Sequence, residues 1–137
     1  MPPLLLDTHA AVWITEDLPL AQEAVEVMNA AHQAGSTVFI SAITAWEIGQ
    51  LVSRNRLSLV ARPERWFQRV LALPGARLAE LSPDILIASS FLPGKPPRDP
   101  ADRIILATAR DLGATLITRD RALLDYGTEG NVSVVGC

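Results

Sequence analysis

The sequence predicts an α/β protein: a three-layer α/β/α sandwich around a mainly parallel sheet of four or five strands. Short runs of branched apolar residues alternate along the chain with longer segments in which apolar residues recur at helical spacing. The short runs lack the polar alternation of a strand with one face in water, which indicates parallel strands buried between helices. Parallel strands need right-handed crossovers, so the alternation predicts the sandwich.

The expected elements follow one another without a long linker, so residues 1–137 are predicted to form a single domain. Ser41 is a good cap for one helix, Pro63 opens another, and Gly113 stops a third. The stretch from Pro93 to Pro97 is the one strong loop signal. We expect strands at residues 4–6, 37–40, 77–81, 114–118 and 131–135, and helices at 8–14, 20–32, 43–52, 63–73, 82–91, 99–112 and 120–126.

Composition narrows the class of protein. No run of about 18 apolar residues indicates a membrane span, and the N-terminus lacks the pattern of a signal peptide. Cys137 is the only cysteine, which favours a cytoplasmic protein without disulfides. The net charge of −3 argues mildly against a nucleic-acid partner. However, all basic residues except Lys95 are arginines, and a planar guanidinium group can donate two hydrogen bonds to one phosphate. Solvent-exposed helix faces explain the abundance of arginine equally well.

Four acids lie where strands end or helices begin, and each has an ordinary structural explanation. Asp7 and Asp120 each follow an expected strand and can cap the next helix. Asp99 and Asp102 flank Pro100 in an arrangement that favours a helix start. Taken singly, capping is the better interpretation of each.

Glu47 is harder to explain in this way. It is the only charged residue between Thr37 and Ser53, and it shares a helix face with Ile43 and Leu51. Burial of an unpaired carboxylate is costly unless the group is paired or binds a metal. No basic residue lies one helical turn away, although Glu47 can still point to solvent from the end of the helix.

Taken together, these acids suggest a metal site. In a parallel sheet Asp7, Glu47, Asp102 and Asp120 come to the same carboxyl edge, where α/β sheets bind ligands. Gathered carboxylates repel one another, and a hard cation such as Mg²⁺ or Mn²⁺ relieves that repulsion. Such a site performs hydrolysis of a phosphodiester by a metal-activated water.

At this point the sequence resembles the PIN-domain ribonucleases, in particular the VapC-type toxins of bacterial type II toxin–antitoxin pairs. The resemblance covers essentially the whole chain, and its pieces come in the family's order and spacing. They are Leu4 to Ala10, Ser41 to Ile48, Arg98 to Arg103 and Leu116 to Asp120.

The resemblance implies a Mg²⁺- or Mn²⁺-dependent endoribonuclease. Asp7, Glu47 and Asp102 match the metal-binding catalytic acids, Asp120 the fourth acid, and Thr118 a supporting hydroxyl. Asp99 is assigned mainly to capping. The resemblance also implies a homodimer and a VapB-like antitoxin whose C-terminal segment enters the active-site groove.

Some nearby residues receive weaker assignments. Arg98 and Arg103 flank the acids and are candidates for contacts with RNA phosphates, although ordinary surface arginines explain them equally well. His9 is expected to lie near the sheet edge without binding metal. Trp13 and Trp46 are expected in the core rather than as platforms for bases.

Two other functional classes remain open on the residues alone. The first is a non-catalytic binding or scaffold module that keeps the fold without the metal. The second is an aspartyl-phosphate switch, which needs a further acid two residues after Asp7 or a lysine at a late strand end. His9 and Lys95 do not meet those needs, so this class ranks below the others.

Overall fold

Five strands pair side by side in the computed structural model, which describes residues 1–137, and every pairing is parallel. The strand order is β3-β2-β1-β4-β5, with β1 in the centre. Leu4 of β1 lies opposite Val38 of β2 and Thr115 of β4, which sets the register of the three inner strands. The strands are β1 (Leu4–Leu6), β2 (Val38–Ser41), β3 (Ala76–Ala79), β4 (Thr115–Thr118) and β5 (Ser133–Gly136).

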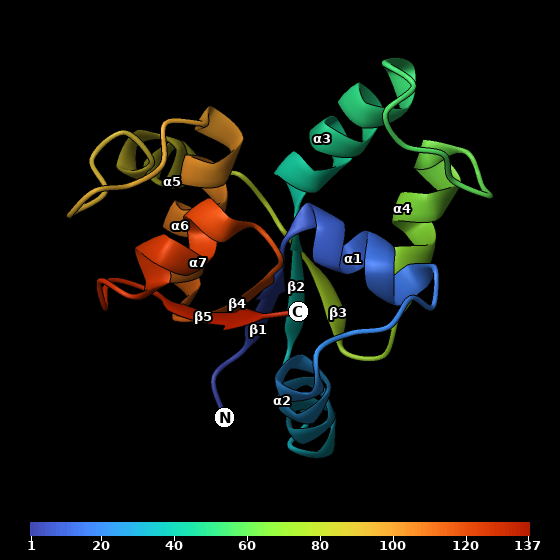
Figure 1. Ribbon diagram of the computed structural model, residues 1–137, viewed down its shortest axis with the longest axis horizontal. Helices are drawn as coiled ribbons and strands as arrows, with labels where there is room; N and C mark the ends of the chain where they lie inside the picture. The colour runs from blue at the N-terminus through green and yellow to red at the C-terminus, as the bar shows by residue number, and fades with distance from the viewer.

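Seven helices surround the sheet and make the three-layer α/β/α sandwich that the sequence predicts (Figure 1). They are α1 (Thr8–Thr15), α2 (Gln22–Gln33), α3 (Ala42–Ser53), α4 (Pro63–Leu71), α5 (Pro83–Ala88), α6 (Pro100–Leu112) and α7 (Arg121–Gly127). Helices α1, α2 and α4 cover one face of the sheet, and α6 and α7 cover the other. Helix α3 rises from the end of β2 between these two layers (Figure 1).

The central strand is buried from both sides. Leu4 and Leu6 pack into the cluster under α1, α2 and α4, whereas Leu5 points to the opposite face and packs under α6 and α7. All three side chains are fully buried. Because adjacent side chains in a strand alternate between faces, a strand covered on both faces reads as a continuous apolar run. Each leucine contributes about 1.5–3 kcal/mol of burial free energy.

The predicted elements are all present, with differences at their ends. The helix expected to reach residue 91 stops at Ala88, because the backbone N–H groups of Ser90 and Phe91 bond three residues back instead of four. Phe91, expected inside that helix, is 80% exposed beyond it. Helix α4 likewise ends at Leu71, two residues early, and β5 begins at Ser133, two residues late. No helix has the length and apolar character needed to cross a membrane.

The topology places a switch point, the position at which open α/β sheets have their ligand crevice, at the carboxyl edge of the sheet. Chain connections lead from β1 outward to β2 and β3 on one side, and later to β4 and β5 on the other. Such a change of direction beside β1 is where open α/β sheets leave room for a ligand. The N-terminal ends of α1, α3 and α7 follow directly from β1, β2 and β4, so they begin at this edge.

Candidate active site

The crevice at the carboxyl edge brings together the acids that the sequence singled out. Asp7 follows β1, Asp120 lies two residues beyond β4, Glu47 lies in the second turn of α3, and Asp102 lies in the first turn of α6. Their charges act on one another: Glu47 is affected by Asp7 and Asp120, and Asp102 by all three of the other acids. The four predicted carboxylates therefore share one local environment.

Asp7 is buried, with 5% of its surface exposed, and both of its oxygens accept hydrogen bonds. Oδ1 accepts the backbone N–H of Thr8 at 2.8 Å, which caps α1, and Oδ2 accepts the hydroxyl of Thr118 at 2.7 Å. Burial raises the pKa of Asp7, and these two hydrogen bonds oppose the rise. The Asp7 side chain therefore caps α1 and also belongs to the candidate site.

Thr118 connects the ends of the two central strands. Its fully buried hydroxyl donates to Asp7 of the β1 end and accepts the backbone N–H of Asp120 at 3.0 Å. Asp120 in turn caps α7, where its Oδ1 accepts the N–H groups of Ala122 and Leu123 at 2.8 and 3.3 Å. Thr118 therefore bonds to two of the four acids, to the carboxylate of Asp7 and to the backbone of Asp120.

Glu47 is half-buried and is held by a pair of threonines. Thr8 donates its hydroxyl to Oε1 of Glu47 at 2.7 Å, and the hydroxyls of Thr8 and Thr44 lie 3.1 Å apart. A hydroxyl has one proton to give, so Thr44 donates to Thr8. Burial, with repulsion from Asp7, Asp99 and Asp120, raises the pKa of Glu47 from 4.5 to about 7 despite the Thr8 bond.

The sequence prediction missed Thr8 and Thr44. Both are fully buried polar residues, and both lie one helical turn or less from an acid. The usable signal was the hydroxyl directly after Asp7 together with the hydroxyl three residues before Glu47. A buried carboxylate needs a hydrogen-bond donor beside it, and a threonine hydroxyl supplies that donor without adding charge.

Asp102 is half-buried, and its carboxylate makes no hydrogen bond within the protein. Asp99 caps α6 by accepting the N–H of Asp102 at 2.9 Å, which confirms the assignment of Asp99 to capping. Burial is the main reason that the pKa of Asp102 rises from 3.8 to about 7, followed by repulsion from Asp120 and Asp99. The Asp102 carboxylate is therefore a free ligand in an electronegative crevice.

No ion pair joins a basic side chain to any of these acids. The one ion pair of the protein joins the exposed Arg62 and Glu64 at 3.3 Å, at the start of α4. The donor set is therefore made of carboxylate oxygens with no cation of the protein's own, and such a set suits Mg²⁺ or Mn²⁺. No three of these side chains lie close enough together to form a preformed metal site. The residues fit a hard cation by their chemistry and their shared crevice, in an open arrangement.

The neighbouring arginines, His9 and the two tryptophans differ in their exposure and contacts. Arg98 is exposed, whereas Arg103 is half-buried and donates its Nε to the carbonyl of Pro97 at 2.7 Å. His9 is exposed in the first turn of α1, and its charge lowers the pKa of Asp7. The prediction that Trp46 lies in the core is wrong, because 57% of its surface is exposed on the outer side of α3. Trp13 is half-buried.

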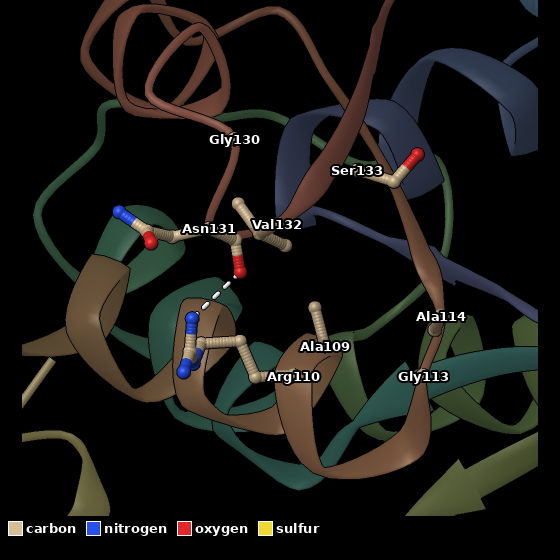
Figure 2. Close-up of a pocket in the computed structure, with 8 residues that line it drawn as sticks. All are labelled: Ala109, Arg110, Gly113, Ala114, Gly130, Asn131, Val132 and Ser133. Carbon is tan, nitrogen blue, oxygen red and sulfur yellow. Dashed lines mark hydrogen bonds between the residues drawn. The ribbon is translucent and has the colours of Figure 1, made fainter. Parts of the chain in front are cut away.

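Several hollows of the molecule lie away from these acids. One of about 500 Å³ opens at the amino ends of β4 and β5 and the C-terminal end of α6 (Figure 2). A second, more apolar hollow of about 420 Å³ lies between α2 and the turn before β3. Neither is lined by any of the four acids, so size alone does not locate this site.

Comparison with known proteins agrees with the geometry. Residues 4–129 match the family model described as the PIN domain. The chain is 32% identical over 127 residues to Ribonuclease VapC22 of Mycobacterium tuberculosis, an alignment that covers 92% of this chain and 93% of that protein.

Solved structures share the fold at lower sequence identity. The chain superposes with a TM-score of 0.68 and 16% identity on the VapBC2 complex from Rickettsia felis bound to a promoter DNA fragment, covering 97% of both chains. It superposes with a TM-score of 0.64 and 23% identity on FitAB bound to an IR36 DNA fragment, covering 97% of this chain and 94% of the other. The similarity to FitAcB from Neisseria gonorrhoeae has a TM-score of 0.59 at 22% identity, over 96% of this chain and 95% of that one. The family match over most of the chain and the VapC relative show that this chain belongs to the PIN-domain family, within its VapC-like group.

Proposed function

We propose that this protein is a Mg²⁺- or Mn²⁺-dependent endoribonuclease and the toxin of a VapBC-type toxin–antitoxin pair. The observation that supports it most directly is the crevice of four carboxylates with no basic partner, two of which have pKa values raised to about 7. Carboxylates under mutual repulsion are a source of cation affinity, since a bound cation replaces repulsion with attraction. The relationship to Ribonuclease VapC22 supports RNA as the substrate.

In this proposal Asp7, Glu47, Asp102 and Asp120 hold the cation. When bound, a divalent cation lowers the pKa of a coordinated water and polarises the phosphate under attack. The protein contributes the positions of its ligands: Thr118 orients Asp7, and Thr8 orients Glu47. Asp102, with no internal hydrogen bond, is available to the ion or to a water molecule.

The further partners follow from the relatives and belong to the same proposal. The structural neighbours VapBC2 and FitAB are complexes, which supports a VapB-like antitoxin as the protein partner of this chain. We also propose that residues 1–137 act as one domain, that the chain forms a homodimer and that it acts in the cytoplasm. Light scattering of the purified chain, alone and with its antitoxin, tests the stoichiometry.

The decisive experiment compares RNA cleavage and metal binding by the same samples. We expect cleavage of a single-stranded RNA with Mn²⁺ or Mg²⁺, none with EDTA, and a loss of roughly 100-fold or more in Asp7→Asn. Calorimetry should detect Mn²⁺ binding to the wild type and weaker binding to Asp7→Asn, with circular dichroism confirming that both are folded.

Two results would contradict the proposal in different ways. Heat of Mn²⁺ binding without any RNA cleavage would point to a PIN-like binding module. Cleavage by Asp7→Asn at the wild-type rate would remove the assigned ligands from the reaction.

A further inference from the structure

Arg119 occupies an unusual place beside the acidic crevice. It lies in the chain between Thr118, whose hydroxyl bonds to Asp7, and Asp120, which caps α7. An arginine among acids would normally pair with one of them, yet Arg119 takes part in no ion pair. Its guanidinium carbon instead lies 3.6 Å from the centre of the Trp13 ring, on helix α1.

The stack on Trp13 gives this guanidinium a defined position without using up its donors. A cation over an indole face is attracted by the ring, and stacking leaves the N–H groups in the guanidinium plane free for hydrogen bonds. No hydrogen bond from the Arg119 side chain to another protein group is present. Arg119 is exposed, so a ligand can reach it.

Arg119 differs in this respect from Arg103 on the other flank and from Arg110. Arg103 commits its Nε to Pro97, and Arg110, far along α6, commits its NH1 group to Asn131. Arg98 and Arg103 lie at the start of α6, on the face covered by α6 and α7, whereas Trp13 belongs to the face covered by α1. Arg119 therefore belongs to a different layer of the fold from Arg98 and Arg103, and it adjoins the site through its chain neighbours Thr118 and Asp120.

We propose that Arg119, held by Trp13, binds a phosphate group of the RNA strand next to the one that is cleaved. This inference rests on the proposed function, since it concerns how the same substrate is held. A polyanion entering a crevice of four carboxylates is repelled, and a fixed cation on the rim offsets that repulsion. A planar guanidinium fork matches two phosphate oxygens, and pre-ordering by the ring lowers the entropic cost of making both contacts. Arg119 is thus a positioning residue for substrate, and it does not act on the reacting atoms.

The test measures binding of a single-stranded RNA oligonucleotide in EDTA by fluorescence anisotropy, so that no cleavage is needed. Arg119→Met keeps the aliphatic length and removes the charge, and the dissociation constant should rise about tenfold, as loss of a charge-assisted pair implies. The slope of log affinity against log salt should shrink by about 0.7, the value for one phosphate contact on a single strand. Arg119→Lys should lie between wild type and Arg119→Met.

Two further variants separate a fixed contact from general charge. Arg121→Met removes an exposed arginine two residues away that stacks on no ring, and it should change affinity less than twofold. Trp13→Leu keeps an apolar side chain but removes the ring, and it should weaken RNA binding about threefold through the lost ordering of Arg119. With Mn²⁺ present, Arg119→Met should raise KM and leave kcat close to the wild-type value.

The outcomes distinguish this inference from the proposed function. Wild-type RNA affinity in Arg119→Met, an equal loss in Arg121→Met, or no measurable RNA binding by the wild type would overturn the role of Arg119. An unchanged affinity in Trp13→Leu would overturn the role of the stack. If Arg119→Met loses affinity as expected but the wild type cleaves no RNA, the phosphate contact stands and the nuclease proposal fails.

Discussion

The two edges of the sheet are built from the same five strands, yet they differ in charge and in hydrogen bonding. At the amino edge the hollow of about 500 Å³ has a single charged residue, Arg110, whose NH1 group donates to the carbonyl of Asn131 at 2.6 Å (Figure 2). At the carboxyl edge four acids share a crevice without any ion pair. The one charged side chain of this hollow donates to a backbone carbonyl, whereas the acids at the carboxyl edge repel one another.

The direction of the strands explains this difference. In a parallel α/β fold the helices after strands begin at the carboxyl edge, where free N–H groups favour an acid as a cap. Asp7, Asp99 and Asp120 all cap helices here, so backbone chemistry alone already gathers negative charge at this edge. Glu47 and Asp102 add negative charge at this edge without capping a helix. The site thus extends a feature of the fold, and capping and metal binding are compatible roles for one residue.

The largest effect should come from comparing two acids on the same helix. Asp102 lies in the first turn of α6 at the carboxyl edge, and the exposed Asp111 lies near its other end. We expect Asp102→Asn to lower kcat/KM for RNA roughly 100-fold or more, because a metal ligand is lost. Asp111→Asn should leave kcat/KM unchanged and slightly raise the melting temperature, since it removes a negative charge from a helix C-terminus.

Equal activity losses in these two variants would contradict a special role of the carboxyl edge in RNA cleavage. Mn²⁺ calorimetry on both proteins provides the second measurement, and only Asp102→Asn should bind the ion more weakly.

The metal-free protein should become less stable as the pH rises from about 4.5 to about 7. Folding raises the pKa of Glu47 from 4.5 to about 7, so in this window the folded state holds protons that the unfolded state has released. Stability then falls with pH, and Asp102 acts in the same direction. Because both groups are partly exposed, we expect a total loss of about 1–2 kcal/mol in the free energy of unfolding.

Urea unfolding in EDTA at several pH values measures this slope. Glu47→Gln should make the slope shallower, and Mn²⁺ at pH 7.5 should restore stability to the wild type because the ion binds only the folded protein. A metal-free stability that rises between pH 5 and 7 would contradict the raised pKa values.

Thr118 offers a smaller effect on activity through the position of Asp7. Thr118→Val keeps the shape of the side chain but removes the donor to Asp7 and the acceptor for the Asp120 N–H. We expect a loss of about tenfold in kcat/KM, the lower range for groups that orient metal ligands. Thr118→Ser should retain most of the activity.

Thr108→Val is the matched control, since Thr108 is also fully buried but donates only to the carbonyl of Ile104 within α6. Activity should be unchanged in this variant. A similar loss in both valine variants would indicate that Thr118 matters for packing alone.

The sequence predicted the sheet and the helices, because these follow from local patterns; the role of the four acids stays a prediction. The apolar run of Leu4 to Leu6 and the proline and glycine signals act over a few residues, so they can be interpreted without the fold. The shared crevice followed from one topological rule about parallel strands. The match to the PIN-domain family spans residues 4–129, which include all four segments that carry the resemblance.

Long-range contacts between polar side chains were beyond prediction. Thr8 reaches Glu47 across 39 positions, and Thr118 reaches Asp7 across 111. Trp46 shows the opposite error: an apolar residue on an apolar helix points outward, because α3 extends away from the sheet and has core on one side only. Exposure of such a residue depends on how its helix sits in the fold, which local spacing does not encode.

The smallest effect on activity should come from the amino edge itself. Gly113 ends α6 with φ of 61°, a left-handed conformation that disfavours a side chain, and an added Cβ would meet nothing within 4 Å. Gly113→Ala should therefore cost about 1–2 kcal/mol of stability through backbone strain alone, with RNA cleavage unchanged. Gly49, inside α3, also has open space around its Cβ position but no positive φ, so Gly49→Ala should instead stabilise by about 0.5–1 kcal/mol. Opposite signs in the two variants, measured by urea unfolding, would assign the amino edge to fold stability; a loss of RNA cleavage in folded Gly113→Ala would instead connect the hollow of Figure 2 to function.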